Sequence, residues 1–207
     1  ERHELFKTLD ESRNDREALL ETLDIWDMQL ATYGSRIINS RREFIDKLNP
    51  VLLDIHYEIS GGKEKINLSY QPSCEPEDLY EEILKNRERD SIYKQTSAGP
   101  HRDDFVFRNE NRDMKIFGSN GQQRTAALSL KLSELDLIEQ EKNEKPVLLL
   151  DDVLSELDRD RQRQLLKSLK ETQTIITCTG VDEFIEGELK EARKFYIEEG
   201  RLKKTEG

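Results

Sequence analysis

Residues 145–152 read "KPVLLLDD", an apolar run that begins after Pro146 and ends at two aspartates. A short apolar run between such boundaries predicts a strand that is buried on both faces, as the strands of parallel sheets are. A helix is predicted at 159–171, and a second apolar run, "QTIITCT", follows at 173–179. This alternation of strand and helix predicts an α/β fold with a mainly parallel sheet.

Two carboxylates stand directly after the first of these strands. In α/β sheets, ligands bind at the edge where the carboxyl ends of the strands lie. We interpret Asp151 as a ligand of Mg²⁺, directly or through water, and Asp152 as the group that orients or deprotonates an attacking water. The alternative is that the two acids only begin a loop.

A polar stretch with two glycines, "FGSNGQQRT" at 117–125, precedes a helix that is predicted to run to about Gln140. Free N–H groups at a helix N-terminus, together with the helix dipole, attract phosphate. The stretch is therefore a candidate anion site. The alternative is a loop that only turns the chain.

Residues 1–50 carry a helical repeat. Apolar residues recur at alternating spacings of four and three, at Leu19, Leu23, Trp26, Leu30, Tyr33 and Ile37. This is the pattern of a coiled-coil seam, although a helical hairpin that packs on an ordinary core fits equally well. Pro50 is predicted to end or kink this helix. We therefore expect a helical arm segment at 1–50 and an α/β domain at 51–207.

The remaining elements are predicted from local pattern alone. They are strands at 66–70, 104–108, 113–117 and 194–204, and helices at 77–92 and 182–192.

The bulk composition limits the classes of function. The chain has 207 residues and a formal net charge of −11, whereas a dedicated nucleic-acid binder is usually basic, so any contact with DNA would be a local patch. Cys74 and Cys178 are not in a C-x-x-C spacing, which argues against a disulfide framework or a zinc site. Neither a signal peptide nor a long apolar run is visible, so we expect a cytoplasmic protein with no membrane contact. The chain begins with Glu1 rather than Met, which suggests a piece of something longer.

The order of these motifs resembles the C-terminal half of an ABC-type ATPase head. The loop "SNGQQR" at 119–124 is similar to the ABC signature, usually written LSGGQ. The acids Asp151 and Asp152 are similar to the Walker B acid and to the acid after it, which is usually Glu. The tetrapeptide "SELD", from Ser155 to Asp158, is similar to the D-loop.

Within that superfamily the chain resembles the RecF family of bacterial recombination mediators. The resemblance is carried by "WDMQLATYG" at 26–34, "AGPHRDDF" at 98–105, "FGSNGQQRTAALSLKLSE" at 117–134, "LLLDDVLSELDRDRQRQLL" at 148–166 and "QTIITCT" at 173–179. It implies a head-and-arm ATPase, related to SMC proteins, in which two heads clamp two ATP molecules.

The resemblance also implies roles for individual residues and for partners. The γ-phosphate of ATP on the partner head would be contacted in trans by Ser119, Asn120, Gly121 and Gln122. The ATP-dependent homodimer would bind gapped DNA and, with RecR, help load the RecA recombinase. Its setting would be DNA replication, repair, recombination and the SOS response.

Two departures from the family pattern have consequences. The chain contains no P-loop of the form G-x-x-x-x-G-K-S/T, and "SGGKEK" at 60–65 lacks its spacing and hydroxyl. We therefore expect the C-terminal portion of such a protein, without ATPase activity by itself. No histidine follows the second apolar run, where Thr177 and Thr179 are the candidates for the γ-phosphate contact. Hydroxyls cannot supply imidazole chemistry, so we expect slow hydrolysis.

Two alternative functions stay open at this point. A transporter's nucleotide-binding subunit usually has a proline after the second acid and a switch histidine, whereas here Val153 follows Asp152. A non-enzymatic, SMC-like dimerisation module is the other alternative. The pair His101 and Arg102 could meet phosphate or DNA, but a structural role is favoured. The predicted hairpin at 104–117 is a weak DNA candidate.

Overall fold

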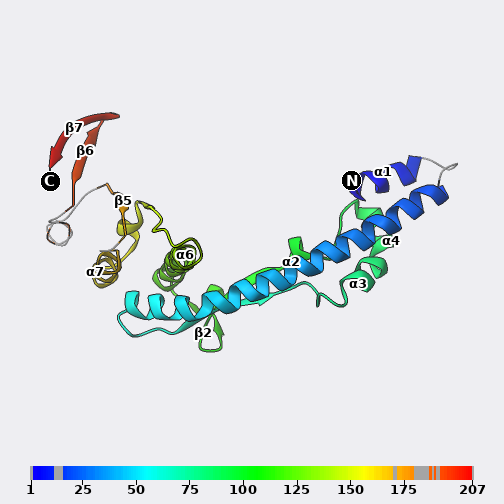
Figure 1. Cartoon of the computed structure of the whole chain (residues 1–207), viewed down its shortest axis with the longest axis horizontal. Coiled ribbons are helices and arrows are strands. Elements are labelled where there is room, and N and C mark those ends of the chain that lie inside the picture. Colours follow the sequence, from blue (N-terminus) through cyan, green and yellow to red (C-terminus); the bar gives the residue numbers. More distant parts are fainter. Residues whose placement is uncertain are drawn as a thin grey trace. The chain divides into compact units, whose positions relative to one another are not determined.

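The computed structural model describes residues 2–11, 16–169, 172–179, 187, 189 and 192–206. The chain divides into two compact units (Figure 1). The first unit comprises residues 1–50 and 67–115, and the second comprises residues 51–66 and 116–207. Helix α2 (Arg16–Ile59) begins in the first unit and ends in the second.

The first unit is built around the long helix α2. Its other elements are α1 (Arg2–Glu11), β1 (Ile66–Gln71), α3 (Leu79–Lys85), α4 (Arg87–Tyr93), the 3-10 helix η1 (Pro100–Arg102), β2 (Asp104–Asn109) and β3 (Arg112–Asp113). The three strands form one sheet in the order β1-β2-β3, with β2 and β3 antiparallel. Figure 1 shows α3 and α4 beside the first part of α2.

The buried face of α2 includes Leu23 of the predicted seam but differs from that seam by one position farther along the helix. Tyr33 and Ile37 are 60% and 44% exposed, whereas their neighbours Gly34 and Ile38 are buried. The cause is close packing of α3, because a Cβ on Gly34 would lie 2.6 Å from Cδ2 of Leu79. The predicted seam therefore holds at Leu23, which is 1% exposed, and is displaced by one position at Tyr33 and Ile37, where Leu79 packs closely on Gly34.

The structure bears on three local predictions in this part of the chain. Of the two alternatives for Pro50, an end of the helix is excluded, since α2 continues to Ile59. The single helix expected at 77–92 is two helices separated at Asn86, whose side-chain amide donates to the carbonyl oxygen of Glu82 at 2.8 Å. The strand expected at 113–117 is only the two-residue β3, because the chain turns directly into helix α5 (Met114–Phe117).

The second unit contains the parallel strands that the sequence predicted. Its elements after α2 are α6 (Asn120–Lys142), β4 (Leu148–Asp151), the 3-10 helix η2 (Val153–Glu156), α7 (Arg159–Ser168), β5 (Thr174–Thr177), β6 (Lys194–Glu198) and β7 (Arg201–Glu206). Strands β4 and β5 are parallel, with Asp151 opposite Thr177.

The last strands differ from the prediction. Strands β6 and β7 form an antiparallel hairpin rather than one long strand. Glu199 and Gly200 both have positive φ and make the turn between them. The helix expected at 182–192 falls largely outside the described residues.

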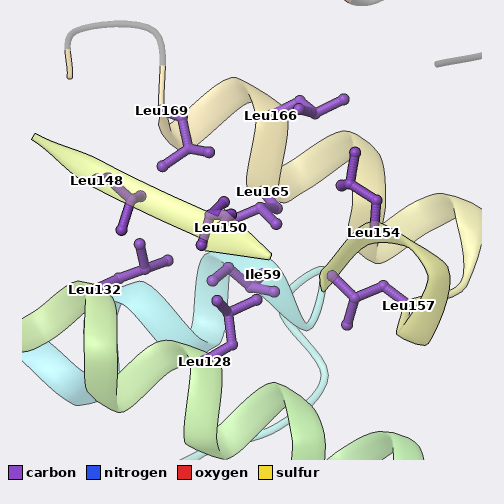
Figure 2. Close-up of a cluster of buried hydrophobic side chains, with 10 residues drawn as sticks. All are labelled: Ile59, Leu128, Leu132, Leu148, Leu150, Leu154, Leu157, Leu165, Leu166 and Leu169. Atoms are coloured by element: carbon purple, nitrogen blue, oxygen red, sulfur yellow. The ribbon is translucent and has the colours of Figure 1, made fainter. Parts of the chain in front are cut away.

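One hydrophobic cluster holds the second unit together (Figure 2). Its residues come from the end of α2, from α6, β4, η2 and α7, and are Ile59, Leu128, Leu132, Leu148, Leu150, Leu154, Leu157, Leu165, Leu166 and Leu169. Only one face of β4 contributes, because Leu149 between two buried leucines is 69% exposed. Ile175 on β5 is likewise 56% exposed. The prediction of strands buried on both faces was therefore wrong for this chain, whereas the cluster does fix the carboxyl end of β4 and the second half of α7.

Candidate nucleotide site

The two acids lie at the carboxyl end of the parallel strands, as predicted. Thr177 is opposite Asp151 in the register, and its hydroxyl donates a short hydrogen bond to Oδ1 of Asp151. The backbone N–H of Asp152 points to the same residue, with the carbonyl oxygen of Thr177 at 3.1 Å and its Oγ1 at 3.2 Å. One threonine on β5 therefore holds both acidic positions at the end of β4.

Asp152 has a backbone conformation that separates its side chain from the strand. Its φ of 52° and ψ of 19° are left-handed, a region that aspartate tolerates better than most residues. This turn leads from β4 into η2, where the Ser155 hydroxyl donates to the carbonyl oxygen of Asp152 at 2.8 Å. The carboxylate of Asp152 is exposed, and no described residue donates a hydrogen bond to it. It is therefore available to a water or a ligand.

The acids fit a metal only together with another source of ligands. Among the described residues, no group of three or more histidine, cysteine, aspartate or glutamate side chains could hold a metal ion. Magnesium, however, is usually bound by one or two carboxylates, by waters and by the phosphates of a substrate. Asp151 can supply one such carboxylate. The arrangement suits Mg²⁺ that arrives with a nucleotide rather than a metal held by protein alone.

The stretch at 119–122 is a helix N-terminus with a complete capping box. The N–H of Gln122 donates to Oγ of Ser119 at 3.3 Å, and the N–H of Ser119 donates to Oε1 of Gln122 at 2.8 Å. The pattern S-x-x-Q could have revealed this cap in the sequence. The N–H groups of Asn120 and Gly121, in the first turn of α6, are those that a helix leaves without intrahelical partners.

Arg161, which was not predicted as a site residue, joins this turn to the D-loop-like segment. A Cβ on Gly121 would lie 2.9 Å from Nη1 of Arg161. Asp158 caps α7, accepting at Oδ1 from the N–H of Arg161 at 3.0 Å, and its Oδ2 is 3.5 Å from Nη1. The other guanidinium nitrogen, Nη2, donates to Oε1 of Glu64 at 2.9 Å. The sequence offered a signal only for the local pair of Asp158 and Arg161.

A buried histidine extends this network. His56, on the last turns of α2, is fully buried, with Nε2 at 3.2 Å from Oε2 of Glu64 and Nδ1 at 3.0 Å from Oγ of Ser129. Burial lowers the pKa of His56, and the Arg161 guanidinium lowers it further, against the raising effect of the Glu64 carboxylate. The neutral imidazole can donate from Nε2 to Glu64. The Ser129 hydroxyl has one hydrogen for two acceptors, Nδ1 of His56 at 3.0 Å and the carbonyl oxygen of Thr125 at 2.8 Å.

Other predicted residues do not converge on these groups. Thr179 follows β5 and is exposed. In the first unit, His101 and Arg102 both contact the carbonyl oxygen of Thr96, the first through Nε2 at 2.9 Å and the second through Nη2 at 3.0 Å. These contacts favour the structural interpretation of this pair.

The parallel strands, the acids that follow β4 and the capped loop before α6 define the signature and Walker B half of an ABC-type ATPase head. No protein-family model matches the chain. Curated relatives named "DNA replication and repair protein RecF" do match. The relative from Agathobacter rectalis is 52% identical over 187 residues, which are 90% of this chain and 52% of the relative. The relative from Lachnospira eligens is 49% identical over 186 residues, 90% of this chain and 51% of the relative.

Solved structures agree with these relatives. A structure of the recombination mediator protein RecF-ATPrS aligns with a TM-score of 0.77 and 37% identity, over 97% of this chain and 54% of that one. A RecF-ATP structure aligns with a TM-score of 0.72 and 38% identity, over 87% of this chain and 50% of that one. The chain belongs to the RecF family, and it spans about half the length of the curated relatives that it matches. No described helix has the length and apolarity needed to cross a membrane.

Proposed function

We propose that this chain is the second half of a RecF-type DNA repair ATPase and completes a nucleotide site in trans. The observation that carries the proposal is the end of β4, where Asp151 is held by Thr177 while the carboxylate of Asp152 is left available. The relatives' name and the RecF-ATP structure support the same assignment. ATP is therefore the proposed nucleotide.

The residues have separate roles in this proposal. Asp151 holds Mg²⁺ that arrives with ATP, and Asp152 orients the attacking water, as carboxylates do in phosphoryl transfer. Ser155 and Asp158 shape the adjoining D-loop-like segment, since one bonds the Asp152 carbonyl and the other caps α7. Thr177 ends β5 and Thr179 follows it, and both are candidates for the γ-phosphate contact that other ATPases of this type make with a histidine.

The capped turn is the proposed contact for the γ-phosphate on the partner head. The capping box and this role are compatible, because a serine hydroxyl accepts and donates at the same time. Oγ of Ser119 accepts from Gln122 and keeps its own hydrogen for phosphate. The free N–H groups of Asn120 and Gly121 add to it at the positive end of the α6 dipole.

The wider role is part of the same proposal, and membership of the family supports it. In the cytoplasm, the ATP-dependent dimer binds DNA at single-strand gaps and, with RecR, helps load RecA. The partners are thus a second copy of the chain, gapped DNA and RecR. Only the longer protein performs this role, because nothing in the 207 residues replaces a P-loop.

A sequence and a binding experiment test the proposal. The reading frame upstream of Glu1 is expected to encode a P-loop, and its absence would contradict the role as the second half of an ATPase. In the protein extended to include it, sedimentation with ATP and Mg²⁺ is expected to show dimers. Ser119→Arg is expected to abolish these dimers and to leave the ATP affinity of the monomer unchanged, because the larger side chain blocks the trans contact. Dimers of wild-type affinity would mean that the turn is only a helix cap.

A further inference from the structure

The guanidinium of Arg161 lies at the N-terminus of α6, where a cation does not stabilise a helix. It contacts the first turn of α6, with Nη1 2.9 Å from the position of a Cβ on Gly121. The N-terminus of a helix carries partial positive charge, so a cation there is unfavourable. The side chain is also only 17% exposed, which adds a cost of desolvation. A nearby anion must therefore compensate the charge of Arg161, and the position of this side chain calls for an explanation.

The compensating group is Glu64. Its carboxylate, 12% exposed, accepts from Nη2 of Arg161 at 2.9 Å through Oε1. The second oxygen, Oε2, is 3.2 Å from Nε2 of the buried His56. Glu64 is thus held from two sides, and its hydrogen bond with Nη2 restrains the guanidinium. The other nitrogen, Nη1, is directed to Gly121 and to Asp158 as a consequence.

The same guanidinium sets the distance between two loops. On one side it lies against the backbone of Gly121, where any side chain would displace it. On the other side it lies 3.5 Å from Oδ2 of Asp158, the cap of α7. An ion pair between Arg124 and Glu156, 3.6 Å apart, also links these segments, but both side chains are about half exposed, and such pairs contribute little. Of these two connections, Arg161, which is 17% exposed, is the less exposed.

We infer that Arg161 is a positioning residue of the trans nucleotide site: anchored by Glu64, it holds the capped turn at Gly121 and the D-loop-like segment at Asp158 in the spacing that a partner head's ATP requires. The inference rests on the proposed function of that site. Arginine suits this role because its planar fork serves several partners in a fixed geometry, which lysine cannot reproduce.

The experiment compares variants in the protein extended to include its P-loop. Arg161→Gln is expected to weaken ATP-driven dimerisation by about ten-fold or more, the usual effect of losing a hydrogen-bonded charged contact. The ATP affinity of the monomer should stay unchanged, because ATP in the same head does not meet this contact. Arg161→Lys should recover only part of the loss. Arg163→Gln, on the same helix and paired with the exposed Asp160, is the matched control and should dimerise normally.

A double variant separates positioning from folding. Arg161→Gln alone leaves Glu64 without its cation and can destabilise the second unit. In Glu64→Gln combined with Arg161→Gln, no charge is left uncompensated, so the melting temperature should recover while dimerisation stays weak. If dimerisation recovers together with stability, Arg161 is only structural and the inference is wrong.

A spectroscopic readout on the 207-residue chain tests the anchor independently. Because the guanidinium lowers the pKa of His56, Arg161→Gln should raise the NMR titration midpoint of His56, and Arg163→Gln should not. An unchanged midpoint would contradict the anchoring of Arg161 by Glu64. Failure of the wild-type protein to dimerise with ATP would overturn the proposed function itself. Normal dimers from Arg161→Gln, with Ser119→Arg monomeric, would overturn only this inference.

Discussion

Each unit contains an arginine that is paired with carboxylates, and the two clusters differ in how far their side chains are buried. In the first unit, Arg2 donates to Asp27 at 2.6 Å and to Asp90 at 2.8 Å, and all three side chains are at most 4% exposed. In the second unit, Arg161 and Glu64 are 17% and 12% exposed, and the guanidinium lies beside a glycine.

The difference separates a structural cluster from a candidate functional one. The first cluster joins α1, α2 and α4, and Arg87 adds two hydrogen bonds to Asp27, at 2.6 and 2.9 Å. Its carboxylates are consumed by internal partners. The second cluster borders two loops whose polar groups are left available, namely the capped turn and the segment after Asp152. Burial alone therefore does not identify a functional charged residue. What identifies it is whether the polar groups around it are left available.

The largest effect on stability is expected from a substitution in the first cluster, which contains Arg2, Asp27 and Asp90. Asp27→Ala should lower the free energy of unfolding by about 3–5 kcal/mol, because it leaves the buried Arg2 and its neighbour Arg87 without their shared carboxylate. Urea denaturation of the 207-residue chain measures this loss. Glu75→Ala breaks the exposed pair with Arg42 and should cost no more than about 1 kcal/mol. Similar losses in both variants would contradict the structural role of the first cluster.

An exposed aspartate should show the opposite behaviour. In the extended protein, Asp152→Asn should slow ATP hydrolysis by about 100-fold or more, because a group that orients water acts in the transition state. Stability, ATP binding and dimerisation should hardly change, since no described residue bonds the Asp152 carboxylate. Asp151→Asn should instead weaken binding of ATP with Mg²⁺. Steady-state turnover and equilibrium binding measure the two effects, and identical behaviour of the two variants would refute the division of roles.

A smaller effect is expected at the glycine that contacts the second cluster. Gly121→Ala places a Cβ 2.9 Å from Nη1 of Arg161, so the guanidinium must shift. ATP-driven dimerisation should weaken, while the free energy of unfolding should stay level or rise, since alanine favours a helix over glycine by about 1 kcal/mol. Ala127→Gly, at an exposed position of α6, should lower the free energy of unfolding and leave dimerisation unchanged. Normal dimers from Gly121→Ala would show that Arg161 can move without consequence.

The smallest effect concerns the pH dependence of the second cluster. Burial lowers the pKa of His56 below its ordinary value of 6.5, so the unfolded chain binds the proton more tightly than the folded one. The stabilising contribution is complete above about pH 6.5 and is lost as the pH falls through that value towards the folded pKa. Thermal unfolding as a function of pH measures it, and His56→Gln should remove this component. A stability that rises as the pH falls below 6.5 would mean that His56 is charged in the fold.

Local pattern was sufficient for elements whose identity depends on neighbours in the chain. The apolar run before Asp151 predicted a parallel strand, and the register with β5 confirms it. The loop at 119–122 was placed correctly at the start of a helix, although its capping box was missed. The predictions that failed depended on what lies opposite an element, as for the hairpin of β6 and β7 and for Leu149 on the exposed face of β4.

The sequence by itself determined the α/β class, the RecF resemblance and the acids at the strand end, because each is written in short stretches with a fixed period or spacing. Only the tertiary structure decided which face of α2 is buried, since that depends on how closely Leu79 approaches Gly34. It alone also brought Glu64 to Arg161 across 97 positions and set that guanidinium against Gly121. Such contacts have no local signature, because folding joins residues whose side chains match in space and not in sequence.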